Sequence, residues 1–140
     1  MNAPTTLAPP PGVRHAEAHL FRSQLIELMA KAEQIITGHF RAADKPIPHL
    51  SGQKLEAARV QSLGDGNQAR YALLSELQAY CDLRSTICHA ELSRPGGPYF
   101  CFRPVADTGV KRWRPVLLTA AEMASILSEA GSLIDRLAKS

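Results

Sequence analysis

Residues 17–40 read EAHLFRSQLIELMAKAEQIITGHF, a long segment in which apolar side chains recur at helical spacing. The apolar stripe consists of Leu20, Phe21, Leu25, Leu28, Met29, Ala32, Ile35, Ile36 and Phe40, and the polar residues off it include Arg22, Glu27, Lys31 and Glu33. A stripe with this period is typical of an amphipathic helix that covers a hydrophobic core. The segment therefore predicts a long first helix and a helical domain.

Two more helices are expected after the first. Pro46 and Pro48 interrupt the apolar period, which returns over residues 51–63 as a short second helix. A turn at residues 64–67, GDGN, separates it from a third helix that runs from about residue 68 toward residue 89. The second segment carries its apolar residues largely on one side, and the third is amphipathic along its length.

A hairpin and a last helix complete the expected fold. Residues 93–98, SRPGGP, cannot continue a helix because proline lacks the backbone donor and glycine favours turns. Two short apolar runs, residues 99–103 and 114–118, predict a two-stranded hairpin. Thr119 and Glu122 then match a capping box at the start of the final helix. The predicted class is mainly α, a helical bundle with a β-hairpin inserted before the C-terminal helix.

The size and composition of the chain suit one domain. It has 140 residues, of which 45% are hydrophobic and 21% charged, enough to bury a core. We expect residues 1–15 to be a disordered N-terminal tail and residues 16–140 to form a single domain. No apolar stretch approaches the roughly 20 residues of a membrane span, and the N-terminal residues lack a signal-peptide pattern. Cys81, Cys88 and Cys101 have neither disulfide-framework nor zinc-site spacing, so a reducing, cytoplasmic location is expected.

Arg84 and His89 are the strongest candidates for catalytic residues. One fixed cation and one group that titrates near neutrality are what metal-free phosphodiester chemistry needs. Arg84 would bind a phosphate, and His89 would move a proton. Residues five apart on a regular helix point about 140° apart. The two would share a site if the helix ends loosely near His89, or if two copies combine their pairs across a twofold axis.

Residues 83–90, LRSTICHA, resemble the R-x4-6-H signature of HEPN domains (higher eukaryotes and prokaryotes nucleotide-binding), which are α-helical bundles. In outline, residues 17–138 are similar to many bacterial members. The resemblance implies a homodimeric, metal-independent endoribonuclease without a cofactor, of the kind that serves as a toxin or defence protein with a cognate antitoxin. It places Arg84 and His89 at the catalytic positions. Ser85 departs from the family, which often has Asn, Asp or His after the arginine.

The resemblance leaves catalysis open, because some HEPN-like proteins are non-catalytic dimerisation or partner-binding modules. A structural role for the pair is the corresponding alternative. Arg84 would then pair with a carboxylate such as Asp82 or Glu91, and the imidazole of His89 would cap the C-terminus of the helix.

Three neighbours of the pair are candidates for supporting roles. Tyr80 precedes Arg84 by about one helical turn and is expected to support its side chain. Ser85 and Thr86 are expected to orient water or substrate beside the pair.

The hairpin segment is the most basic part of the chain. Five basic residues against one acidic residue lie between Arg94 and Arg114, a local net charge of +4 beside +3 for the whole chain. The candidate RNA-binding residues are Arg103, Lys111, Arg112, Trp113 and Arg114, which would contact phosphates and stack on a base. Charges on an exposed hairpin also serve to prevent edge-to-edge pairing, and a lone tryptophan also occurs in cores and interfaces. Both explanations remain open from the sequence.

Overall fold

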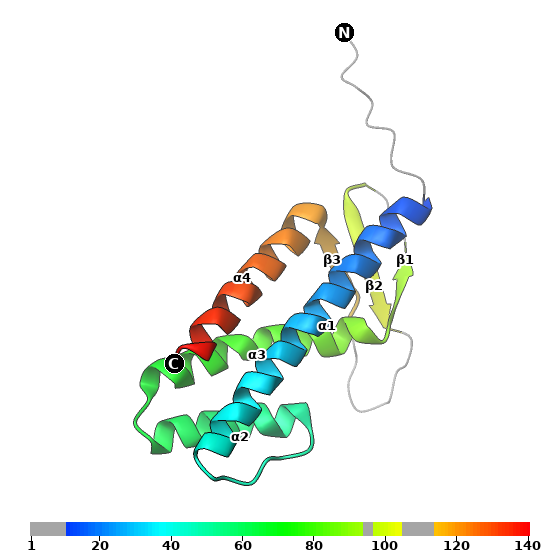
Figure 1. Ribbon diagram of the computed structural model, residues 1–140. Helices are drawn as coiled ribbons and strands as arrows, with labels where there is room; N and C mark the ends of the chain where they lie inside the picture. The colour runs from blue at the N-terminus through cyan, green and yellow to red at the C-terminus, as the bar shows by residue number, and fades with distance from the viewer. Residues whose placement is uncertain (1–10, 94–96, 105–113) are drawn as a thin grey trace.

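The computed structural model describes residues 11–93, 97–104 and 114–140 (Figure 1). In chain order, its helices and strands are α1 (Pro11–Ala42), α2 (Ser51–Gly64), α3 (Gln68–Cys88), β1 (Ala90–Ser93), β2 (Tyr99–Pro104), β3 (Val116–Thr119) and α4 (Ala120–Ala138). The mainly α class and the position of the strands before the last helix are confirmed. Among these residues, no helix is long and apolar enough to cross a bilayer.

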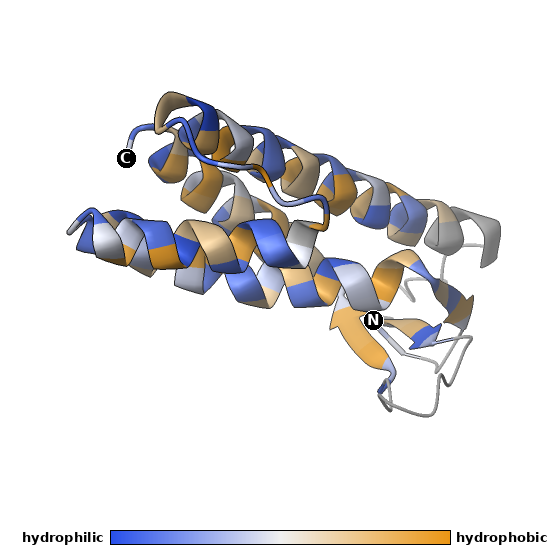
Figure 2. Ribbon diagram, turned by 90° about the horizontal axis from the view of Figure 1, so that it is seen from below, coloured by the Kyte–Doolittle hydropathy of each residue, from blue (hydrophilic) through white to orange (hydrophobic). Residues whose placement is uncertain are grey.

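Helix α1 is the element on which the others pack. Its buried residues keep the spacing seen in the sequence and are Ala18, Phe21, Leu25, Met29, Ala32, Ile36 and Phe40. Helices α2, α3 and α4 all contact it (Figure 1). Each large apolar side chain removed from water contributes about 1.5–3 kcal/mol, so this stripe is a major part of the stabilisation. Figure 2 shows hydrophobic and hydrophilic residues alternating along the helices.

The start of α1 differs from the prediction. We expected residues 1–15 to form a tail, whereas the helix begins at Pro11. Proline is favourable at the first position of a helix because the amide there has no intrahelical partner and the ring already fixes a helical φ. Residues 11–15 therefore belong to α1, and the rest of the expected tail lies outside the described residues.

Helix α3 and helix α4 complete the core and begin at side-chain caps. Leu74, Leu77 and Ile87 of α3 are fully buried, as is Ile134 of α4. At the start of α4 the predicted capping box is confirmed. The Thr119 hydroxyl accepts a hydrogen bond from the Glu122 amide at 3.1 Å, and the Glu122 carboxylate accepts one from the Thr119 amide at 3.1 Å.

The sheet has three antiparallel strands in the order β1-β2-β3. The predicted hairpin is confirmed as β2 and β3, but β1 was not predicted. Phe100 and Phe102 of β2 are buried, and the Phe102 ring lies 5.9 Å from the ring of Phe21 in α1. Tyr99 and Arg103 are exposed. The sheet thus closes the end of the bundle where α1 begins and α3 ends (Figure 1).

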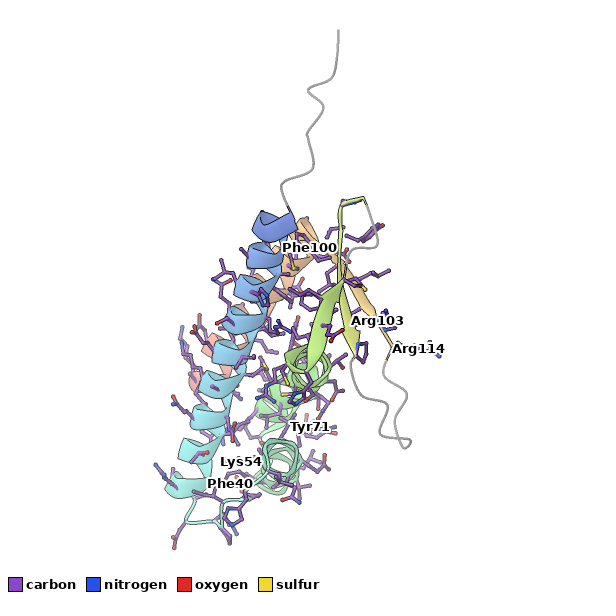
Figure 3. The ribbon with its side chains drawn as sticks, turned by 90° about the vertical axis from the view of Figure 1, so that its right-hand side faces the viewer. Phe40, Lys54, Tyr71, Phe100, Arg103 and Arg114 are labelled. Atoms are coloured by element: carbon purple, nitrogen blue, oxygen red, sulfur yellow. The ribbon has the colours of Figure 1, made fainter. Side chains whose placement is uncertain are left out.

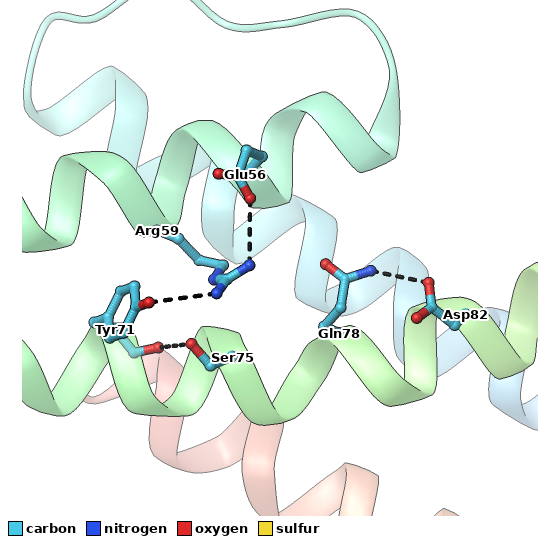
Figure 4. A network of polar contacts seen from close by, with 6 residues as sticks. All are labelled: Glu56, Arg59, Tyr71, Ser75, Gln78 and Asp82. Atoms are coloured by element: carbon cyan, nitrogen blue, oxygen red, sulfur yellow. Dashed lines mark hydrogen bonds and ion pairs between the residues drawn. The ribbon is translucent and has the colours of Figure 1, made fainter.

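Polar contacts along α2 and α3 add to the apolar packing between them (Figure 4). Arg59 of α2 donates to the Glu56 carboxylate at 3.2 Å and to the Tyr71 hydroxyl of α3 at 3.4 Å. Its guanidinium carbon also lies 5.3 Å from the centroid of the Tyr71 ring, within range of a cation–π contact. Farther along α3, the Gln78 amide donates to the Asp82 carboxylate at 2.9 Å.

Candidate functional site at the end of α3

Arg84 lies on α3 at the rim of a pocket of about 160 Å³ between α1, α2 and α3. Its side chain is half-buried. Within the described part of the chain, the guanidinium forms no hydrogen bond or ion pair. Asp82, which the structural alternative paired with it, instead accepts the hydrogen bond from Gln78. Arg84 therefore keeps its donors available for an anion.

His89 is the C-cap residue of α3. Its φ of −108° and ψ of 11° depart from helical values, and its backbone amide donates to the Ile87 carbonyl. The side chain is exposed, and no described residue hydrogen-bonds to the imidazole. The ring therefore does not cap the helix by a hydrogen bond, and it remains accessible to a ligand.

The two residues share one end of α3 but do not meet within one chain. Arg84 lines the pocket beside α1 and α2, and His89 does not line it. No hydrogen bond joins them in the described structure. A five-residue separation along a helix that stays regular to Cys88 explains this divergence. The alternative in which two copies combine their pairs does not depend on the two side chains meeting within one chain.

Arg22 of α1 is a residue of the site that the sequence analysis missed. Its Nη1 donates to the Ala90 carbonyl at 2.7 Å and to the Ile87 carbonyl at 3.2 Å, so it spans the junction between α3 and β1. Its Nη2 lies 2.8 Å from Nδ1 of His19. The sequence shows Arg22 only as a polar residue off the apolar stripe. In the fold, its cation joins a carbonyl in the last turn of α3 to the first carbonyl of β1 and so fixes the backbone on both sides of His89.

The residues expected to support Arg84 make other contacts. The Tyr80 hydroxyl donates to Glu129 of α4 at 3.0 Å. The support that Tyr80 was expected to give the Arg84 side chain stays a prediction. Burial, followed by the neighbouring Glu129, raises the pKa of Tyr80. The Thr86 hydroxyl donates to the Asp82 carbonyl within α3 at 2.9 Å. Ser85 is exposed and lines the same pocket as Arg84.

Two of the basic hairpin residues are described, and both are exposed. Arg103 lies on β2 opposite Glu91 of β1, and Arg114 precedes β3. Figure 3 shows both on the side of the sheet that faces away from α1. Lys111, Arg112 and Trp113 lie outside the described residues, so their predicted RNA contacts stay predictions.

The cysteines and carboxylates form no second candidate site in the described residues. No group of three His, Cys, Asp or Glu side chains there is placed to hold a metal ion. Cys81 lies against Met29, with the two sulfur atoms 3.8 Å apart, and burial raises the pKa of its thiol to about 11. Such a thiol is a packing group rather than a nucleophile at neutral pH.

Comparison with known proteins adds no relative. No protein-family model, curated protein or solved structure matches the chain.

Proposed function

We propose that this protein is a metal-independent endoribonuclease of the HEPN type that acts as a homodimer, with the role of a toxin or defence protein. One observation carries the proposal: a half-buried guanidinium and an exposed imidazole, both without a partner among the described side chains, lie at the same end of α3. The structural alternative would have paired Arg84 with Asp82 or Glu91. Neither ion pair forms in the described structure.

The proposed mechanism divides the work between two copies. His89 of one copy accepts the proton of a ribose 2′-hydroxyl, whose oxygen attacks the adjacent phosphorus. The bond from phosphorus to the 5′-oxygen breaks, and the departing oxygen takes a proton from water. Arg84 of the other copy stabilises the extra negative charge of the phosphorane-like transition state. The products are a 2′,3′-cyclic phosphate and a free 5′-hydroxyl.

The basic hairpin would hold the RNA away from the reacting phosphate. Arg103 and Arg114 supply exposed cations on the outer side of the sheet. Lys111, Arg112 and Trp113 are assigned the same role in the proposal. Contacts of this kind are independent of base sequence and weaken as salt increases.

The test incubates the purified protein with mixed RNA in EDTA, beside the variants Arg84→Ala and His89→Ala. His49→Ala is the matched control, because His49 is also an exposed histidine but lies between α1 and α2. We expect cleavage by the parent and by His49→Ala, with cyclic phosphate ends, and intact RNA with the other two. Circular dichroism confirms that each variant is folded.

A mixing experiment tests whether the site is shared. In a dimer that combines Arg84 of one copy with His89 of the other, the Arg84→Ala and His89→Ala variants together form a heterodimer with one complete site. Refolding the two variants together should then restore about a quarter of the parental rate by statistical pairing. No recovery would mean that each chain uses its own pair.

The alternative is a non-catalytic HEPN-like module that dimerises or binds a partner. Exposed apolar residues on α2 favour it, since Val60 is 61% and Leu63 is 54% exposed. Intact RNA in every lane, from a parent and variants that circular dichroism shows to be folded, would support this module over the ribonuclease.

A further inference from the structure

The pocket beside Arg84 has the features of a small-molecule site that RNA cleavage does not require. Its floor consists of side chains that are at most 7% exposed: Met29, Ala32, Ile36, Leu55 and Leu77. The volume is about 160 Å³. An apolar cavity of about 150 Å³ in a protein can hold a benzene molecule. The floor therefore suits one six-membered ring or a short branched chain.

The rim of the pocket is polar, and two of its four charged residues, Lys54 and Glu33, compensate each other. Lys54 of α2 donates to the Glu33 carboxylate of α1 at 2.7 Å, and Lys54 is labelled in Figure 3. The carboxylate of Asp82 accepts the hydrogen bond from Gln78. Arg84 is the charged rim residue for which the described structure provides no hydrogen bond or ion pair.

We propose that this pocket binds a small carboxylate with a ring or branched apolar body. The apolar body would cover the floor at Met29 and Leu77, and the carboxylate would meet the guanidinium fork of Arg84 in a bidentate arrangement. A monoanion fits better than a phosphate dianion, because the Asp82 carboxylate on the same rim, which has only a neutral hydrogen-bond donor, repels additional negative charge. The proposal goes beyond the ribonuclease function and does not depend on it.

Benzoate is the probe for the first experiment, titrated into 15N-labelled protein and followed by amide chemical shifts. Benzyl alcohol supplies the ring without the charge, and acetate supplies the charge without the ring. We expect saturable shifts at amides around the pocket with benzoate and binding about tenfold or more weaker with either comparator.

Two variants locate the binding. Ala30 is an exposed residue of α1 that lines the pocket, so Ala30→Leu should fill the mouth and abolish benzoate binding without disturbing the core. Ala124→Leu, at an exposed position of α4, is the matched control and should bind as the parent does. Arg84→Gln should weaken benzoate binding about tenfold to a hundredfold, the effect of losing a charge-assisted hydrogen-bond pair.

The proposal is overturned if benzoate gives no saturable shift up to about 50 mM, a concentration at which even weak binding of a ligand of this size would be detected. It is also overturned if Ala30→Leu binds benzoate as well as the parent does. Ala30→Leu leaves Arg84 in place, so its RNA cleavage reports the ribonuclease function separately. If the protein binds benzoate but cleaves no RNA, the proposed carboxylate site is supported and the proposed ribonuclease function is rejected.

Discussion

Replacing Arg22 with methionine should destabilise the protein far more than its position off the apolar stripe suggests. The substitution keeps much of the apolar length of the side chain but removes its donors to the Ile87 and Ala90 carbonyls. Each hydrogen bond from a charged donor contributes about 1.5–3 kcal/mol. Because Arg22 is half-buried, water can hydrogen-bond to part of the group that the substitution exposes, which reduces the loss. We therefore expect the free energy of unfolding to fall by about 2–3 kcal/mol.

Chemical denaturation with guanidinium chloride measures this change, and thermal unfolding should show a decrease in Tm of about 10 °C for a domain of this size. Arg22→Lys should recover less than half of the loss, since an ammonium lacks the planar fork that spans two carbonyls. Amide hydrogen exchange should increase at His89 and Ala90 in Arg22→Met, because the α3–β1 junction loses its tether.

The control is Lys31→Met on the same helix. Lys31 forms an exposed ion pair with Asp135 at 3.9 Å, with side chains 59% and 67% exposed, so its loss should cost less than about 0.5 kcal/mol. If Arg22→Met unfolds within about 0.5 kcal/mol of the parent, the bonds across the junction contribute little, and our account of how His89 is positioned is wrong.

Two further predictions concern ionisable groups in the helical core and on its flank. Since burial raises the pKa of Cys81 from 9.0 to about 11, the native thiol should react with iodoacetamide at least about a hundredfold more slowly at pH 8 than in the unfolded chain. Mass-spectrometric mapping of the modified cysteines measures this, and equal rates in the two states would contradict it. The raised pKa of Tyr80 stabilises the fold fully below the ordinary tyrosine pKa near 10 and less as pH rises through the raised value. Glu129→Gln should remove only part of the increase in the Tyr80 pKa, because burial is the larger cause. Ultraviolet titration against a Tyr80→Phe reference measures this pKa, and an unchanged value would exclude the Glu129 contribution.

The helices could be predicted because their signals are local. The stripe from Phe21 to Phe40 repeats for several turns, and the Thr119 capping box marks one end of a helix within four residues. Strand β1 could not be predicted, since AELS is too short to show a clear alternation and follows a helix almost directly. Its partners in β2 determine its conformation, and no pattern in four residues encodes them.

The sequence indicates the candidate residues of the site but not their geometry. The motif singles out Arg84 and His89, whose catalytic roles stay predictions, and α3 ends close to where the sequence indicated. The side of α3 on which Arg84 lies depends on how three helices pack. The contact of Arg22 with the junction joins residues 65 and 68 positions apart. Contacts over such separations follow from tertiary packing, which a single sequence does not show by periodicity.

The junction between α3 and β1 has a consequence for how this protein can change in evolution. His89 alone separates the last residue of the helix from the first residue of the strand. Adding or removing one residue there would exchange the two faces of β1, turning Glu91 toward the core and Leu92 away from Phe102. We therefore expect insertions and deletions between the helix and the strand to be poorly tolerated. The position of His89 is therefore constrained by the backbone geometry of the junction, whatever the role of its side chain.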